Sequence, residues 1–297
     1  MLKMISAAYH MNIGDRRGSL LLKSYIESWF GVEVDMVGYQ IPWTEDRIED
    51  LLYNCDGIIL GPGGVILESA NYTLLSCEPA NLFQRISVPM ISMAAGFNIN
   101  RWPPESWRAN LKSTFGAMDL IGLRTGLGRD LATKLGFKSS YSPDPLLFVG
   151  DPSMPVIKDK VIVSWHYDFA QAVYKLYSEF LADKYDVVEV YHDKDNILNV
   201  ADYADCDFVV TDRFHGCVLA AAYGKPFITF DFNTKLLGIA SDFGIKDVLR
   251  SDALDEDKFG MFLAHKERIR KQLPQRLASA KRSFADFMIK VGQFFGR

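Results

Sequence analysis

Residues 206–232 read CDFVVTDRFHGCVLAAAYGKPFITFDF, and this stretch decides the fold class. The short apolar run CDFVV at 206–210 predicts a buried strand. It is followed by CVLAAAYGKP at 217–226, a run of good helix formers that should end at Gly224. The next apolar run, FITFDF at 227–232, predicts a second strand. Strand, helix and strand in this order indicate a βαβ unit of a parallel sheet.

The rest of the chain repeats this alternation of short apolar runs and amphipathic stretches. Strands are expected at 4–10, 32–39, 56–60, 88–96, 119–124, 160–166 and 187–192. Helices are expected at 15–31, 45–54, 128–137 and 168–185. Near the end of the chain, one face of a terminal helix is indicated by Leu273, Leu277, Phe284, Phe287, Val291 and Phe294.

The segment SPDPLLFVGDPSMP at 142–155 contains four prolines. Helices and central strands tolerate proline badly, so this segment is the expected linker. It divides the chain into two domains, at 1–150 and 151–297. The predicted fold class is α/β, with two Rossmann-like domains facing across a cleft and a C-terminal helix packing back. In such sheets ligands bind beyond the carboxyl ends of the strands.

The composition argues against two classes of protein. The net charge of -4 and the pI near 5.8 exclude a protein whose main partner is nucleic acid, which would need a basic surface. The first residues lack the apolar core of a signal peptide, and no apolar run approaches the ~18 residues of a membrane span. The four cysteines form no CxxC pair and are expected as buried free thiols. These features predict a cytoplasmic protein.

The turn TDRFHG at 211–216 is the most informative candidate site. It lies where a strand leads into a helix amino terminus, which presents backbone N–H groups and favours anions. Arg213 adds a planar cation that suits phosphate or carboxylate, and His215 can move a proton near neutral pH. The alternative is structural, with Arg213 paired to an aspartate and His215 packed on the sheet. Gly216 completes the turn.

Other strand ends supply further candidates for substrate binding. They are Asn12, Gly14 and Asp15 after the first strand, Gly63 and Gly64 in GPGG, Arg124, His166 and Lys235. Each has a structural alternative. Asn12 would cap a helix, GPGG would be a turn that needs positive φ, and His166 would pack among aromatic residues. No metal-ligand cluster is visible in the sequence.

The stretch from 206 to 235 resembles the hallmark segment of the polysaccharide pyruvyl transferase family. The matching residues are Asp207, Arg213, His215, Gly216, Gly224, Pro226 and Lys235. Weaker likenesses are NIGD at 12–15, the glycines after DGIIL, AAG at 94–96, Arg124 and PDP at 143–145. The chain departs from the family pattern at Arg16 and at the proline within GPGG.

The resemblance implies a two-domain architecture similar to GT-B glycosyltransferases. It also implies transfer of pyruvate from phosphoenolpyruvate to two hydroxyls of a glycan or sugar precursor, with no cofactor. Phosphoenolpyruvate carries two anionic groups. Arg213 and the helix terminus would hold one of them, and Arg124 or Lys235 the other. His215 would protonate the enol methylene, and Asp15 is the candidate base near the acceptor.

Two other functions stay open at this point. One is a glycosyltransferase with a nucleotide-sugar donor, and the other is a non-catalytic member of the family. The oligomeric state is not indicated. Residues 265–297 contain nine Lys or Arg and two acidic residues, so a terminal helix could either contact an anionic membrane peripherally or pack on the acidic body.

Overall fold

The structure is a computed structural model of the whole chain. It describes residues 1–6, 13–38, 45–67, 86–98, 105–165, 171–190, 200–231 and 233–296. By its contacts the chain divides into two compact units. Unit 1 comprises Met1–His10, Asp15–Pro145 and Arg282–Arg297, and unit 2 comprises Met11–Gly14 and Leu146–Lys281.

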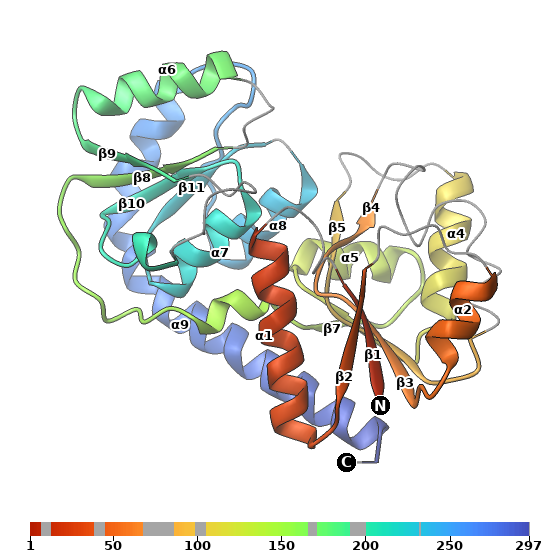
Figure 1. Cartoon of the computed structure of the whole chain (residues 1–297). Helices are drawn as coiled ribbons and strands as arrows, with labels where there is room; N and C mark the ends of the chain where they lie inside the picture. The colour runs from red at the N-terminus through yellow and green to blue at the C-terminus, as the bar shows by residue number, and fades with distance from the viewer. Residues whose placement is uncertain are drawn as a thin grey trace. The chain divides into compact units, whose positions relative to one another are not determined.

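Among the described residues, unit 1 is built on a seven-stranded parallel sheet with the order β2-β1-β3-β5-β6-β7, in which β4 also pairs with β5 (Figure 1). The strands are β1 (Leu2–Ser6), β2 (Val34–Gly38), β3 (Gly57–Leu60), β4 (Gly63–Leu67), β5 (Met90–Asn98), β6 (Leu120–Leu123) and β7 (Ser140–Tyr141). The central strands are largely apolar, because a parallel sheet is covered by helices on both faces. Ile58, Ile59 and Leu60 of β3 are accordingly fully buried.

Two sets of helices cover this sheet. The first set is α2 (Glu45–Leu52), α4 (Glu105–Gly116) and α5 (Gly126–Lys134), whose Leu51, Phe115 and Leu131 share one apolar cluster with β3 and β5. The second is α1 (Ile13–Phe30) and the last turns of the long helix α9 (Glu256–Phe294). The rings of Tyr25 and Phe284 join these two helices edge to face.

Unit 2 has a four-stranded parallel sheet with the order β11-β10-β8-β9 in the part of the chain that is described. Its strands are β8 (Lys160–Ser164), β9 (Asp186–Glu189), β10 (Phe208–Thr211) and β11 (Phe227–Thr229). Its helices are α6 (Gln171–Ala182), α7 (Phe214–Ala222), α8 (Thr234–Asp242) and the first part of α9, with two short 3-10 turns at Pro145–Phe148 and Val200–Tyr203. Every residue of α7 is buried, as expected for a helix rich in alanine and other apolar residues.

The two parallel sheets confirm the α/β class predicted from the sequence. The expected βαβ unit is present as β10, α7 and β11, and Gly224 ends α7 with a φ of 67°. The expected domain bounds at 1–150 and 151–297, and the cleft between the domains, stay predictions.

Two details of the sequence-based expectation were wrong, and a third was not predicted. Gly63 and Gly64 begin strand β4, which was not predicted, rather than lying in a turn. The burial of residues 142–147, with Asp144 at 2% exposure, was not predicted, and the boundary between the two units falls within the expected linker, after Pro145. Phe294 is 37% exposed rather than buried, because it is the last residue of α9.

Other expectations hold in the described residues. Cys55, Cys206 and Cys217 are buried free thiols, while Cys77 lies outside the described residues. Burial raises the pKa of the Cys206 and Cys217 thiols to about 12, so both are unreactive at neutral pH. None of the helices in the described part of the chain combines the length and the apolar character that a bilayer crossing requires.

Candidate functional site

The turn between β10 and α7 consists of Asp212 and Arg213, and it is held by short hydrogen bonds. The Arg213 N–H donates to Thr211 Oγ1 at 2.9 Å, and the Thr211 hydroxyl donates to the carbonyl of Ser164 at 2.8 Å. The Asp212 N–H donates to the same carbonyl at 3.3 Å. The turn is therefore fixed to the carboxyl ends of two neighbouring strands, β8 and β10.

Gly216 is required by packing beneath this turn. A Cβ atom at this position would lie 2.4 Å from Thr211 Oγ1, much closer than side chains tolerate. The glycine of the RxHG motif thus allows the first turn of α7 to approach the end of β10. Its contact with substrate, expected from the sequence, stays a prediction.

Arg213 and His215 both lie at the amino terminus of α7 and are buried, at 7% and 4% exposure. Arg213 is the N-cap residue, with an extended backbone (φ −97°, ψ 127°), and His215 is the second helical residue. The positive end of the helix dipole lies at the same place as these two side chains. A guanidinium, an imidazole and a helix amino terminus in one place form an arrangement that suits an anion.

Asp212 is bound by an aromatic side chain that the sequence analysis did not single out. The Tyr174 hydroxyl, on α6, donates a hydrogen bond to the Asp212 carboxyl group, and both side chains are 5% exposed. Burial, then the charge and the hydrogen bond of Asp212, raises the pKa of Tyr174, while the charge of Arg213 opposes this rise. Tyr174 therefore remains a hydrogen-bond donor at any physiological pH. No local pattern marks Tyr174, because its partner is 38 positions away.

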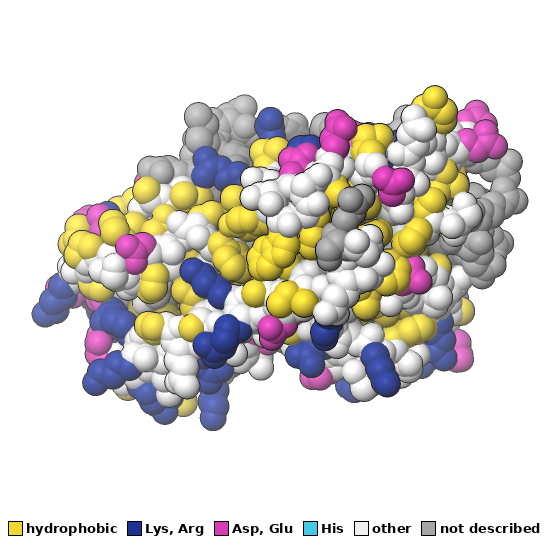
Figure 2. Space-filling model, turned by 90° about the horizontal axis from the view of Figure 1, so that it is seen from below, with side chains coloured by type: hydrophobic (Ala, Val, Ile, Leu, Met, Phe, Trp, Pro, Cys, Tyr) yellow, Lys and Arg dark blue, Asp and Glu magenta, His cyan; other side chains and the backbone are white. Residues whose placement is uncertain are grey.

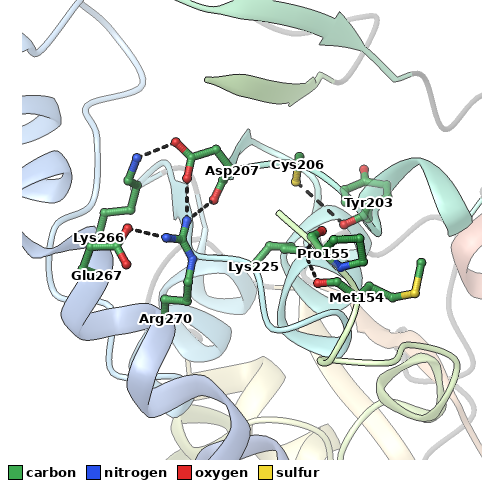
Figure 3. Close-up of polar contacts among 9 residues, drawn as sticks. All are labelled: Met154, Pro155, Tyr203, Cys206, Asp207, Lys225, Lys266, Glu267 and Arg270. Carbon is green, nitrogen blue, oxygen red and sulfur yellow. Dashed lines mark hydrogen bonds and ion pairs between the residues drawn. The ribbon is translucent and has the colours of Figure 1, made fainter. Parts of the chain in front are cut away.

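The opposite, amino-terminal end of β10 carries a separate group of charges (Figure 3). Asp207 accepts hydrogen bonds from Lys266 Nζ, at 2.5 Å, and from the Arg270 guanidinium, which also contacts Glu267. Burial alone would raise the pKa of Asp207, but the hydrogen bonds and charges of Lys266 and Arg270 lower it below its usual value. Asp207, one of the family-like residues, thus attaches α9 to unit 2.

Lys225 likewise has a structural role. Its side chain is 1% exposed, and its ammonium donates to the carbonyls of Met154 and Pro155 at 3.0 and 2.9 Å (Figure 3). Burial lowers the pKa of Lys225. The lysine of the GKP turn therefore anchors the segment that enters unit 2.

In unit 1, Arg124 is buried at the carboxyl end of β6, where it pairs with Asp144. Arg124 Nη1 lies 3.4 Å from Asp144 Oδ2, and both side chains are 2% exposed. The guanidinium also covers Gly96, since a Cβ there would lie 2.1 Å from Arg124 Nε. The structure thus brings together three weak family likenesses, namely AAG at 94–96, Arg124 and PDP at 143–145.

The glycines near β3 and β4 have backbone conformations that suit glycine. Gly61 and Gly63 have φ values of 119° and 115°. A Cβ on Gly61 would lie 2.1 Å from the Met93 carbonyl oxygen, which explains this glycine by packing. Gly63 is buried and Gly64 is half-buried. The role of Gly63 and Gly64 in substrate binding stays a prediction.

The remaining candidates are placed as follows. Gly14, which belongs to unit 2, leaves room for the imidazole, because a Cβ there would lie 2.2 Å from His215 Nδ1. Asp15 lies in the first turn of α1 and is half-buried, and Lys235 is half-buried on α8. Asn12 and His166 lie outside the described residues. Unit 2 therefore contains Gly14, Arg213, His215, Gly216 and Lys235.

The basic terminal region makes several inward contacts within unit 2. In addition to Lys266 and Arg270, Arg276 donates to the Asp242 carbonyl and Lys281 lies over the ring of Phe148. The exposed charged residues of α9 are five basic (Lys258, Arg268, Lys271, Arg282, Lys290) and four acidic (Glu256, Asp257, Glu267, Asp286). On the face shown in Figure 2, Lys and Arg side chains are interspersed with acidic and uncharged ones. These contacts favour packing of the terminal helix on the protein over contact with a membrane. A peripheral membrane contact stays a prediction.

Among the described residues, no group of three or more His, Cys, Asp and Glu side chains could hold a metal ion. The fold itself resembles that of several solved structures. The structure is similar to the MnaA–UDP complex from S. aureus, with a TM-score of 0.60 and 12% sequence identity over 92% of this chain and 90% of that chain. It is also similar to a UDP-N-acetylglucosamine 2-epimerase, with a TM-score of 0.55 and 15% identity over 98% of this chain and 96% of that chain. A third similar structure is CalG4, the calicheamicin glycosyltransferase, with a TM-score of 0.54 and 12% identity over 99% of this chain and 97% of that chain. At these identities the likeness concerns the fold, and it confirms the predicted GT-B-like class.

At the level of sequence, a comparison with curated proteins gives no significant match. The profile of a protein family, by contrast, matches residues 12–234, which is most of the chain and includes the whole β10–α7 turn. The chain belongs to the polysaccharide pyruvyl transferase family.

Proposed function

We propose that this protein transfers pyruvate from phosphoenolpyruvate to two hydroxyl groups of a glycan or sugar precursor, forming a cyclic ketal. The observation that carries the proposal is the joint burial of Arg213 and His215 in the first turn of α7, at the carboxyl end of β10. Family membership supports the reaction type. We also propose a cytoplasmic location, consistent with the free buried cysteines.

Donor binding requires cations for a phosphate and a carboxylate. Arg213 and the α7 terminus would hold one group, since a guanidinium matches two oxygens at once. Lys235 and Arg124 are the candidates for the other group. The ion pair with Asp144 already compensates the charge of Arg124, which favours Lys235 for this role. Lys235 also belongs to the same unit as Arg213.

The chemistry needs one acid and one base. His215 gives a proton to the enol methylene, which becomes a methyl group and leaves a cationic carbon at C2. A sugar hydroxyl attacks C2 and loses its proton to a base, for which Asp15 is the candidate. The bond from C2 to the phosphate oxygen then breaks, and inorganic phosphate leaves. A second hydroxyl attacks C2 and gives its proton to the departing phosphate, which closes the ketal. General acid catalysis by His215 is expected to contribute about 10²–10⁴-fold.

Two measurements test this proposal. Calorimetric titration of the purified chain with phosphoenolpyruvate tests the donor, and phosphate release with a panel of free, nucleotide-linked and lipid-linked sugars tests the reaction. We expect His215→Gln to bind phosphoenolpyruvate with an affinity within about tenfold of the wild type. Its rate of phosphate release should fall by about 100-fold or more.

Arg250→Ala is the control variant. Arg250 is 56% exposed and pairs with the exposed Asp252, so its loss should change neither binding nor turnover. Binding of a nucleotide-sugar without binding of phosphoenolpyruvate would overturn the proposal in favour of a glycosyltransferase. Unchanged phosphate release by His215→Gln would remove the histidine from the mechanism.

A further inference from the structure

We propose that Tyr174 is a positioning residue of the donor site, which acts through Asp212 to fix the turn that presents Arg213. This inference rests on the proposed function, because it assigns Arg213 to donor binding. It adds a residue from α6 to the residues already proposed for donor binding.

The backbone and the side chain of this two-residue turn are held by different elements. The N–H groups of Asp212 and Arg213 are bound to Ser164 and to Thr211, on strands β8 and β10. The hydrogen bond from Tyr174 fixes the Asp212 side chain from a helix instead. Because Asp212 directly precedes the N-cap residue Arg213, movement of Asp212 would alter the direction in which the guanidinium points.

Tyr174 is itself rigidly held. Its ring stacks on Trp165 with centroids 4.7 Å apart and an angle of 3° between the planes. Phe230 packs edge-on against both rings, at 5.8 Å from each. These aromatic contacts place the hydroxyl without needing the hydrogen bond, so the phenol can serve as a fixed point for Asp212.

The electrostatics of the pair also suit an anion site. A carboxyl group beside Arg213 would repel an incoming anion and could draw the guanidinium toward itself. The Tyr174 hydroxyl satisfies one oxygen of Asp212 and directs it toward α6. Removing the hydroxyl takes one hydrogen-bond donor from a buried carboxylate, which is costly, and lets the Asp212 side chain move relative to Arg213, the next residue in the chain.

The test is Tyr174→Phe, which keeps the stacked ring and removes one oxygen atom. We expect this variant to bind phosphoenolpyruvate about tenfold more weakly than the wild type in calorimetric titration. In an Arg213→Lys background the same change should weaken binding by less than about twofold. Such non-additivity is the signature of a residue that acts through Arg213, and a purely structural role would give equal effects in both backgrounds.

Tyr177→Phe is the matched control. Tyr177 lies one turn further along α6, packs edge-on against Phe230 at 5.3 Å, and is fully buried. Its hydroxyl accepts a hydrogen bond from the Asp255 N–H at 2.8 Å instead of contacting Asp212. We expect Tyr177→Phe to lower the melting temperature as much as Tyr174→Phe and to leave the affinity for phosphoenolpyruvate within twofold of the wild type.

The outcomes separate the inference from the proposed function. If the wild type binds phosphoenolpyruvate and Tyr174→Phe binds it equally well, the positioning role is wrong and the proposed function stands. Equal weakening by Tyr174→Phe and Tyr177→Phe would also overturn the inference, since it would reflect general loosening of α6. If the wild type does not bind phosphoenolpyruvate, the proposed function fails first and the inference fails with it.

Discussion

The two ends of strand β10 each carry buried charged side chains, but the charges are arranged differently. At the amino end, two acids (Asp207, Glu267) and two bases (Lys266, Arg270) form one connected network (Figure 3). At the carboxyl end, the first turn of α7 gathers Arg213, His215 and the positive end of a helix dipole, with Asp212 bound to Tyr174. The first network pairs carboxylates with cations and is electrically balanced, whereas the second places an arginine and a histidine at the positive end of a helix dipole and binds its carboxylate through a neutral hydroxyl.

This difference shows that burial of a charge does not by itself indicate a functional site. A balanced network of carboxylates and cations stabilises the contact between two elements, here β10 and α9. A buried cation beside a helix amino terminus, in contrast, is stabilised further when an anion binds. We therefore assign the amino end of β10 to stability and propose the carboxyl end for donor binding.

The largest expected effect concerns binding at the carboxyl end. We expect Arg213→Ala to weaken the affinity for phosphoenolpyruvate by about 100-fold or more, because a charged hydrogen-bonding partner of the anion is lost. Its free energy of unfolding should fall less than that of an Asp207 variant. Calorimetric titration and urea unfolding of the same samples measure both quantities. A large loss of stability with unchanged affinity would reverse our assignment of the two ends.

The next effect concerns stability at the amino end. Asp207→Asn leaves Lys266 and Arg270 without their carboxylate, and we expect a loss of about 2–3 kcal/mol. This is below the roughly 3–5 kcal/mol of a fully buried pair, because the two cations retain 17% and 23% exposure. Urea unfolding checks the loss, and titration with phosphoenolpyruvate should give wild-type affinity. A variant of wild-type stability would show that α9 does not depend on this network.

A smaller effect is expected from Gly216→Ala, which disturbs the carboxyl end through packing. The added methyl group would meet Thr211 Oγ1, the acceptor of the Arg213 N–H. Such overpacking typically costs about 1–3 kcal/mol. Because the displaced atom accepts the hydrogen bond of the Arg213 N–H, affinity for phosphoenolpyruvate should fall together with stability. Gly260→Ala, where an added Cβ meets nothing within 4 Å, is the control. It should leave the affinity unchanged and raise the stability by roughly 0.5–1 kcal/mol, because alanine favours a helix more than glycine does.

The smallest effect is the pH dependence of the balanced network. The pKa of Asp207 is lowered in the folded protein, so its stabilising contribution is fully present above the unfolded pKa of about 3.9 and is lost as the pH falls through the folded value. The stability gap between the wild type and Asp207→Asn should therefore be constant from pH 7 to about pH 5 and shrink below about pH 4. Urea unfolding over this range measures it, and a gap that does not change with pH would contradict the ionic origin.

Much of the fold could be predicted because the signals are local. The strand and helix periods, the stop of α7 at Gly224 and the two runs of βα units all follow from residues a few positions apart. Strand β4 was missed because Gly63 and Gly64 read as a turn, and only the neighbouring strand β5 makes that segment a strand. The burial of residues 142–147 was missed because proline content does not report which surface a segment packs on.

The candidate site was predicted in part for the same reason. Arg213 and His215 stand in one short motif, and their position at a strand-to-helix turn can be seen without a structure. Asp207 belongs to the same motif, yet its partners Lys266 and Arg270 lie 59 and 63 positions further on. Its structural role therefore could not be distinguished from a functional one in the sequence.

The sequence by itself determined most of the order of strands and helices, the end of α7 at Gly224, and the placement of a cation and an imidazole at the amino terminus of α7. The tertiary structure alone decided the partners of the buried charged groups. Asp207 pairs with two cations of α9, Arg124 pairs with Asp144, and Asp212 accepts a hydrogen bond from the hydroxyl of Tyr174. The physical reason is the distance along the chain over which each kind of interaction acts. Periodicity and capping act over one or two turns of chain, whereas the energy of a buried charge depends on partners that only folding brings within hydrogen-bond distance.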